Sequence, residues 1–159
     1  MSPAELTEQP TVSNGTLRAN HLKAQTVALG IDPNALPIPR PDPSGARLKS
    51  PTAPEVYLVD PSGYLRWVPN PDTYDNLFRD WNGITISTGL DAIARGSDIT
   101  SGAVLSKGSN SDQVYLISNG IRRWITSPAV MDKYYFNWNK IVVVPQVVID
   151  SIPQGENWT

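Results

Sequence analysis

Short segments rich in β-branched and aromatic residues lie on both sides of two sharp turns. Such segments around an Asn-Gly pair predict a β-hairpin, because both central residues of a type I′ turn take positive φ. Asn119-Gly120 is such a pair, and Gly63 closes the corresponding turn earlier in the chain. The pattern therefore predicts two hairpins, built from the segments 56–59, 64–68, 114–117 and 121–125.

The second hairpin repeats the first as part of a longer unit. Most matching residues lie 57 positions apart, as in 124 − 67 and 138 − 81. A period of this length is typical of supersecondary units that bury their apolar faces against one another. We therefore expect repeat 1 at residues 44–100 and repeat 2 at residues 101–159. The matching groups are Ser44-Gly45-Ala46 with Ser101-Gly102-Ala103, Val56-Tyr57-Leu58 with Val114-Tyr115-Leu116, Arg66-Trp67 with Arg123-Trp124, and Trp81-Asn82 with Trp138-Asn139.

The two hairpin turns differ in length by one residue, and this difference tests the alignment. Counting outward from each turn places Tyr57 opposite Trp67 and Tyr115 opposite Trp124. The length difference therefore preserves the pairing register. Each hairpin is expected to carry a Tyr/Trp pair on one face and Val, Leu and Arg on the other.

A short helix is predicted after each hairpin. Asn70 and Ser127 are good N-cap residues, and each precedes a proline, whose missing N–H is not needed at the first helical position. Helices are expected over 71–79 and 128–136, with a strand near the start of each repeat and another after each helix. The predicted fold is strand-dominated α+β, in which two tandem β-β-β-α-β repeats form one domain.

Residues 1–43 are predicted to form an N-terminal arm and proline-rich linker. Seven prolines lie between positions 33 and 54, and proline fixes φ and removes an N–H, so this stretch is expected to be extended. A short helix is predicted over 16–29. The first ten residues show no export signal, so the chain is extracellular or envelope-associated only if it is a mature or trimmed form.

Composition argues against several functional classes. A net charge of −2 is too balanced for a surface that holds nucleic-acid phosphates. The chain has no cysteine and a single histidine, His21, so neither a metal site nor a cofactor is expected. The longest apolar stretch, near residues 141–149, is shorter than the roughly 18 residues of a membrane span.

Catalytic motifs are not apparent, and the chain is expected not to be an enzyme. The aspartates lie mainly at turns and helix starts, although a carboxylate pair acting as a small hydrolase remains a third interpretation. Asp75 and Asp132 recur in the middle of the predicted helices. They are expected to pair with the recurring Arg66 and Arg123 and so hold helix to hairpin.

The tryptophans have two interpretations. Repetition in register is typical of core anchors, which would bury the pairs Trp67/Trp124 and Trp81/Trp138. Alternatively, the Tyr/Trp faces of the hairpins are shallow platforms for sugar rings, with neighbouring asparagines as hydrogen-bonding groups, and two weak sites gain from avidity. The candidate ligand-binding residues are Tyr57, Trp67, Asn82, Tyr115, Trp124 and Asn139.

The repeated motifs, Val-Tyr-Leu, a glycine turn, Arg-Trp-(Val/Ile), a proline-started helix and Trp-Asn-x-Ile, support a resemblance. Over residues 44–159 the chain resembles short tandem modules that recur in bacterial secreted or envelope-associated proteins, often as accessories to other domains. The resemblance implies no catalytic residue. The favoured function is lectin-like recognition of a carbohydrate or cell-surface polymer. The alternative is a protein-interaction or assembly module that pairs through an exposed sheet edge, with a partner chain or as a homo-oligomer.

Overall fold

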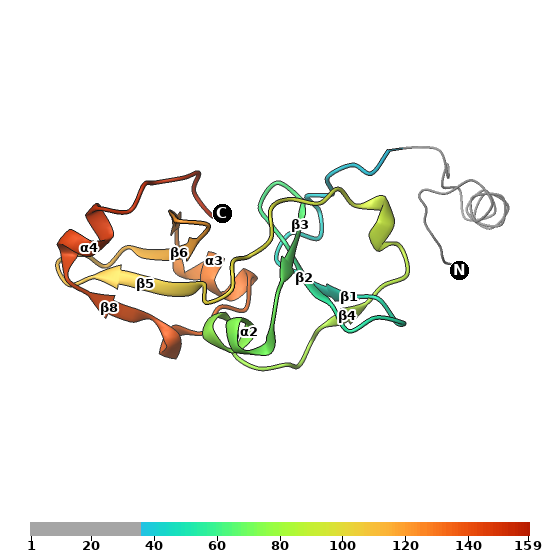
Figure 1. The fold of residues 1–159 in the computed structure, drawn as a ribbon, viewed down its shortest axis with the longest axis horizontal. Coiled ribbons are helices and arrows are strands. Elements are labelled where there is room, and N and C mark those ends of the chain that lie inside the picture. Colours follow the sequence, from blue (N-terminus) through green and yellow to red (C-terminus); the bar gives the residue numbers. More distant parts are fainter. Residues whose placement is uncertain (1–35) are drawn as a thin grey trace, which may run out of the picture. The chain divides into compact units, whose positions relative to one another are not determined.

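The computed structural model describes residues 36–159, and the predicted helix over 16–29 lies outside this range. Within residues 36–159 no helix has the length and apolar character needed to cross a bilayer. The described residues form a strand-rich α+β structure with two four-stranded sheets (Figure 1). The elements are β1 (Arg47–Lys49), β2 (Val56–Val59), β3 (Leu65–Val68), α2 (Pro71–Leu77), β4 (Thr85–Ile86), the 3₁₀ helix η1 (Leu90–Ala92), β5 (Val104–Gly108), β6 (Val114–Ser118), β7 (Ile121–Ile125), α3 (Pro128–Lys133), the 3₁₀ helix η2 (Trp138–Lys140), β8 (Val142–Val144) and α4 (Gln146–Asp150).

The predicted pairing register of both hairpins is confirmed. In the β2–β3 hairpin Tyr57 lies opposite Trp67, and in the β6–β7 hairpin Tyr115 lies opposite Trp124. Asn119 and Gly120 both have positive φ, of 58° and 70°, as a type I′ turn requires. The one-residue difference in length is therefore confined to the turns, and corresponding side chains of the two hairpins lie on the same face of their sheets.

The two sheets have the same strand order, β3-β2-β1-β4 and β7-β6-β5-β8. In each, a hairpin is extended by an antiparallel strand and then by a short parallel strand, β4 or β8. On the opposite edge, the segment that ends each repeat runs parallel to the second hairpin strand. Leu65 bridges to Arg95 in repeat 1 and Arg122 bridges to Gln154 in repeat 2. This equal topology agrees with the internal similarity of the sequence.

Both predicted helix starts are confirmed. The Asn70 side chain accepts a hydrogen bond from the Thr73 N–H, and the Ser127 side chain accepts one from the Val130 N–H. A proline follows each cap, as the sequence predicted. Both helices end two to three residues before the predicted boundary, because the chain leaves the helix to make contacts between the repeats.

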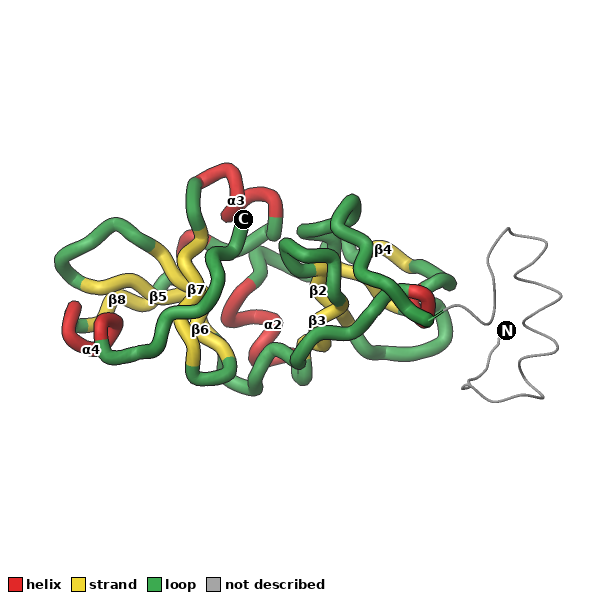
Figure 2. Tube along the Cα trace, turned by 90° about the horizontal axis from the view of Figure 1, so that it is seen from above, coloured by secondary structure: helices red, strands yellow, loops and turns green. Residues whose placement is uncertain are grey.

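The main core is shared by the two repeats. Leu58, Leu77 and Phe78 of repeat 1 belong to one buried apolar cluster with side chains of repeat 2 that include Leu116 and Phe136. Helix α2 lies between the two sheets in both views (Figures 1 and 2). Two side chains of α2 bond the start of repeat 2: the Thr73 hydroxyl accepts a hydrogen bond from the Gly102 N–H, and the Asn76 amide donates one to the Ala103 carbonyl. The sheets are therefore joined by a common core as well as by the chain.

The described end of the arm packs against repeat 1. Ile38 pairs with the segment around Ile93, and the Arg40 N–H donates to the Gly63 carbonyl at 2.9 Å. Gly63 has φ +91°, and a Cβ placed on it would lie 2.3 Å from the Arg40 carbonyl carbon and 2.4 Å from the Pro41 nitrogen. This glycine is therefore needed both for the turn and for the close approach of the arm.

We predict that Gly63→Ala lowers the free energy of unfolding by about 2 kcal/mol or more, because it adds a clash with the arm to the strain of positive φ. Gly120→Ala is the matched control, since a Cβ there meets open space at φ +70°, and it should lose only about 1 kcal/mol. Urea unfolding of the full chain measures both. Equal losses would show that the arm does not press on this turn.

Candidate functional site

The two tyrosines predicted to form binding faces are covered by arginines. Tyr57 is half-buried, with the Arg95 guanidinium 4.5 Å from its ring centre, and burial raises the pKa of its hydroxyl. Tyr115 is buried, and Arg122 lies 5.0 Å from its ring centre. The Tyr115 hydroxyl also accepts from Arg122 and donates to Gln113, both at 3.0 Å. Tyr115 is therefore closed to a ligand, and Tyr57 has an arginine over its ring.

The repeated tryptophans are not core anchors. Trp81 is 47% exposed and Trp138 is 44% exposed, whereas Trp67 and Trp124 are half-buried. The most buried tryptophan is Trp158, at 1%, which received no assignment from the sequence. It occupies, beside β7, the position that Ile99 takes beside β3: the Ile99 N–H donates to the Trp67 carbonyl and the Trp158 N–H to the Trp124 carbonyl. The core-anchor interpretation is therefore wrong for the pair Trp81/Trp138, whereas the half-buried pair Trp67/Trp124 does not decide it.

Repeat 2 contains an open pocket with two of these tryptophans in its wall. Its volume is about 430 Å³, within the range of about 300–1,000 Å³ that ligand pockets usually have. Its apolar lining comes from β6, β7, α3 and η2, and its polar lining lies just before β6 and at the turn into α3. The lining residues are Asp112, Gln113, Val114, Trp124, Ile125, Thr126, Ser127, Pro128, Met131 and Trp138.

Of the six residues predicted to bind ligand, Trp124 is the one that lines this pocket. Asn82 and Asn139 are exposed, and their backbone N–H groups donate to Asp80 and Asn137 in local turns. Trp138 also lines the pocket but was not predicted to bind ligand, although its repetition of Trp81 was a signal that could have pointed to it.

The polar groups of the pocket are arranged at its rim. Gln113 accepts from the Tyr115 hydroxyl through Oε1, which orients its amide nitrogen as a donor. The Ser127 side chain accepts a hydrogen bond from the Val130 N–H at the start of α3, and this bond fixes its orientation. Asp112 is exposed, with its carboxylate 3.9 Å from the Lys107 ammonium. An apolar floor with amide, hydroxyl and carboxylate groups at the rim suits a ligand with both apolar and hydroxyl-bearing surface.

The corresponding place in repeat 1 is occupied by the protein itself. Tyr74 is buried, and its ring stacks on Trp81 with 3.9 Å between centroids. Its hydroxyl accepts from Arg47 at 2.6 Å and donates to the Asp80 carbonyl at 2.6 Å. The Trp81 indole N–H donates to Asp75 at 2.9 Å. Each polar atom of this aromatic pair therefore has a protein partner.

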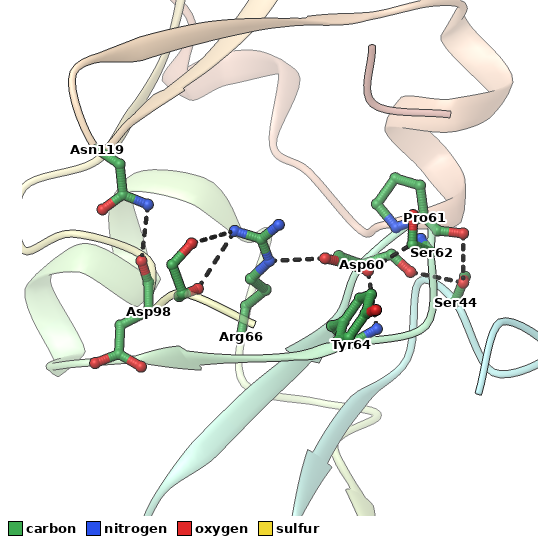
Figure 3. A network of polar contacts seen from close by, with 9 residues as sticks. Ser44, Asp60, Pro61, Ser62, Tyr64, Arg66, Asp98 and Asn119 are labelled. Atoms are coloured by element: carbon green, nitrogen blue, oxygen red, sulfur yellow. Dashed lines mark hydrogen bonds and ion pairs between the residues drawn. The ribbon is translucent and has the colours of Figure 1, made fainter. Parts of the chain in front are cut away.

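The predicted pairing of Arg66 with Asp75 is wrong. Arg66 Nε donates to Asp60 at 2.7 Å, and its Nη1 donates to Ser97 at 2.9 Å (Figure 3). Asp60 is already held in the hairpin turn, where it accepts from the Tyr64 N–H. The turn carboxylate is thus the closer partner, and Asp75 bonds Trp81 instead.

The predicted pairing of Arg123 with Asp132 is also wrong. Asp132 accepts from Arg79 of repeat 1 at 2.5 Å, and Arg79 Nε donates to the Phe136 carbonyl at 2.9 Å. The contact therefore joins one repeat to the other, instead of joining a helix to its own hairpin. Repetition could not point to Arg79, because the corresponding residue of repeat 2 is Phe136 and not an arginine.

Tyr135 is at the centre of the contact between the repeats. It has φ 59°, unusual for a bulky residue, and its ring lies 4.2 Å from the Arg47 guanidinium and 5.3 Å from that of Arg79. Its hydroxyl donates to Asp80 at 2.7 Å. This hydrogen bond is the main reason that the pKa of Asp80 is lowered and the pKa of Tyr135 is raised.

Among residues 36–159, no group of three or more His, Cys, Asp and Glu side chains is arranged to hold a metal ion. No protein-family model matches the chain, and no curated protein or solved structure shows detectable similarity to it. The pocket of repeat 2 is therefore the starting point for a function.

The Asp80 and Asp132 contacts predict acid sensitivity. Hydrogen bonds from Tyr135 and from Arg79, respectively, favour the ionised carboxylates and lower the pKa of each in the folded state. Their stabilisation is present above the unfolded pKa of about 4 and is lost as the pH falls below it. We expect the melting temperature to fall on acidification below that pH, and to fall less steeply in the Asp80→Asn/Asp132→Asn variant. Identical slopes for variant and parent would contradict this assignment.

Proposed function

We propose that the chain is a non-enzymatic recognition module that binds a carbohydrate, as the free sugar or as part of a cell-surface polymer, in the pocket of repeat 2. The observation that supports this most directly is the placement of Trp124 and Trp138 in one pocket whose rim carries amide, hydroxyl and carboxylate groups. Sugar rings have apolar C–H faces that pack on indole and hydroxyls that bond such rim groups.

The lining supports binding over catalysis. Among the described residues that line the pocket, Asp112 is the one ionisable side chain, and it is exposed. Glycoside hydrolysis generally uses two carboxyl groups, at about 5 to 9 Å from each other across the sugar. The pocket offers shape and hydrogen bonds, which are sufficient for recognition.

Binding is tested with the full chain on a glycan array, followed by tryptophan emission titrations with the sugars that bind. We expect a change in emission, because Trp124 and Trp138 contact the ligand, and at least a tenfold loss of affinity in Trp124→Ala. Trp67→Ala, at the equivalent position of repeat 1, is the control and should retain affinity. An array without a single bound glycan would refute the function.

A second candidate, assembly through a sheet edge, is favoured by β8. Val142 and Val143 are 46% and 59% exposed. The Val142 carbonyl accepts from the Ser106 hydroxyl and the Val144 carbonyl from the Ser109 N–H, so both face β5. Backbone groups alternate in direction along a strand, so those of Val143 point to the open edge. An apolar edge strand with free backbone groups is a template for pairing with a second copy.

If β8 pairs with β8 of another copy, light scattering should show a mass that rises toward that of a dimer with protein concentration. Val143→Lys should keep the chain monomeric, because a charge on an edge strand opposes pairing. Thr85→Lys on β4 is the control and should leave the mass unchanged. A monomer at all concentrations would exclude self-assembly through this edge.

A further inference from the structure

The two repeats differ beside their second tryptophan. In repeat 1, Tyr74 stands three residues after the proline that begins α2, and its ring stacks on Trp81. In repeat 2, Met131 stands at the same place after Pro128, and it lines the pocket together with Trp138. The stacking partner that Trp81 finds in its own repeat is therefore missing for Trp138.

A second substitution accompanies the first. Arg47 lies opposite Leu58 in β1–β2, and Leu105 lies opposite Leu116 at the same register position of β5–β6. Arg47 is buried and donates to the Tyr74 hydroxyl. Leu105 is also buried, and its aliphatic side chain has no hydrogen-bond donor. Repeat 1 thus has both the ring and the group that holds it, whereas repeat 2 has the buried apolar side chains of Met131 and Leu105 at these two positions.

We infer that the ring of a bound sugar stacks on Trp138 as the ring of Tyr74 stacks on Trp81, so that the chain has one glycan site, in repeat 2. This inference rests on the proposed carbohydrate-binding function. Tyr74 mimics such a ligand, since it presents a ring face to an indole and a hydroxyl to hydrogen-bonding partners. The expectation of two equivalent sites is thereby replaced by one.

The charge of the lining further limits the ligand to an uncharged sugar. Asp112 carries the only formal charge among the described residues that line the pocket, and neither lysine nor arginine is among them. Sugar hydroxyls donate strong hydrogen bonds to a carboxylate. A uronate, sulfate or phosphate group in the same place would meet the like charge of Asp112, which Lys107, at 3.9 Å and outside the lining, offsets only in part.

The experiment is calorimetric titration of the full chain with a neutral glycan selected from the array and with a glycan of equal length that contains glucuronic acid. We expect one neutral glycan per chain and at least tenfold weaker binding of the acidic one. Met131→Tyr should reduce affinity at least tenfold, because repeat 1 already accommodates tyrosine at this place. Met131→Leu, which keeps the volume, is the conservative comparison and should lose less affinity than Met131→Tyr.

Trp138→Ala provides a second test that does not depend on folding of the tyrosine variant, because this side chain is partly exposed. It should abolish binding, whereas Trp81→Ala should retain it with an unchanged stoichiometry of one. Binding of two glycans per chain, full affinity in Met131→Tyr with an unchanged melt, or preference for the acidic glycan would overturn the inference while the proposed function stands. Absence of any glycan binding by the parent would refute the function itself.

Discussion

The structure depends on one contact, in which the ends of helices α2 and α3 meet in antiparallel fashion. Phe78 bridges to Phe136, with the Arg79 N–H donating to the Tyr135 carbonyl and the Asn137 N–H to that of Leu77. The rings of Phe78 and Phe136 are stacked at 5.7 Å within the shared core. This core takes side chains from both repeats, so part of the apolar face of each sheet is buried by the other repeat. The contact between the repeats therefore stabilises both, as in other tandem arrays.

The same contact explains why the corresponding place in repeat 1 is filled by side chains of the protein. Arg47 is buried and lies on the ring of Tyr135, so its guanidinium requires hydrogen-bond partners within the protein. Tyr74 and the Asp80 carbonyl provide them, at 2.6 and 3.4 Å. The ring of Tyr74 then stacks on Trp81. Repeat 1 therefore uses its aromatic pair to hold repeat 2, and repeat 2, with Leu105 in place of Arg47, has no such requirement.

Local patterns were sufficient to predict the elements, and they were insufficient for the contacts between repeats. The Asn-Gly turn, the capped prolines and the alternation of side chains each act within a few residues, and they predicted the Tyr57/Trp67 and Tyr115/Trp124 registers correctly. Arg79 bonds Asp132 across 53 positions, a pairing that no local rule contains. For the candidate site, repetition pointed to the tryptophans, but the side chain that packs against each indole could not be predicted from it. That side chain is Tyr74 in repeat 1 and Met131 in repeat 2, and this is one of many positions at which the sequences of the two repeats differ.

The proposed function depends on what lies against the indole of Trp138. Trp81 and Trp138 are exposed to a similar degree, at 47% and 44%, but the ring of Tyr74 is stacked on Trp81, whereas no ring of residues 36–159 is stacked on Trp138. Trp138 also lies in a pocket with a second tryptophan and with polar groups at the rim, so it is not an isolated apolar residue on the surface. Repeat 1 thus provides its indole with an aromatic partner, and repeat 2 has Met131 at the corresponding position. Under the proposed function, the ring of the ligand supplies in repeat 2 the stacking that Tyr74 supplies in repeat 1.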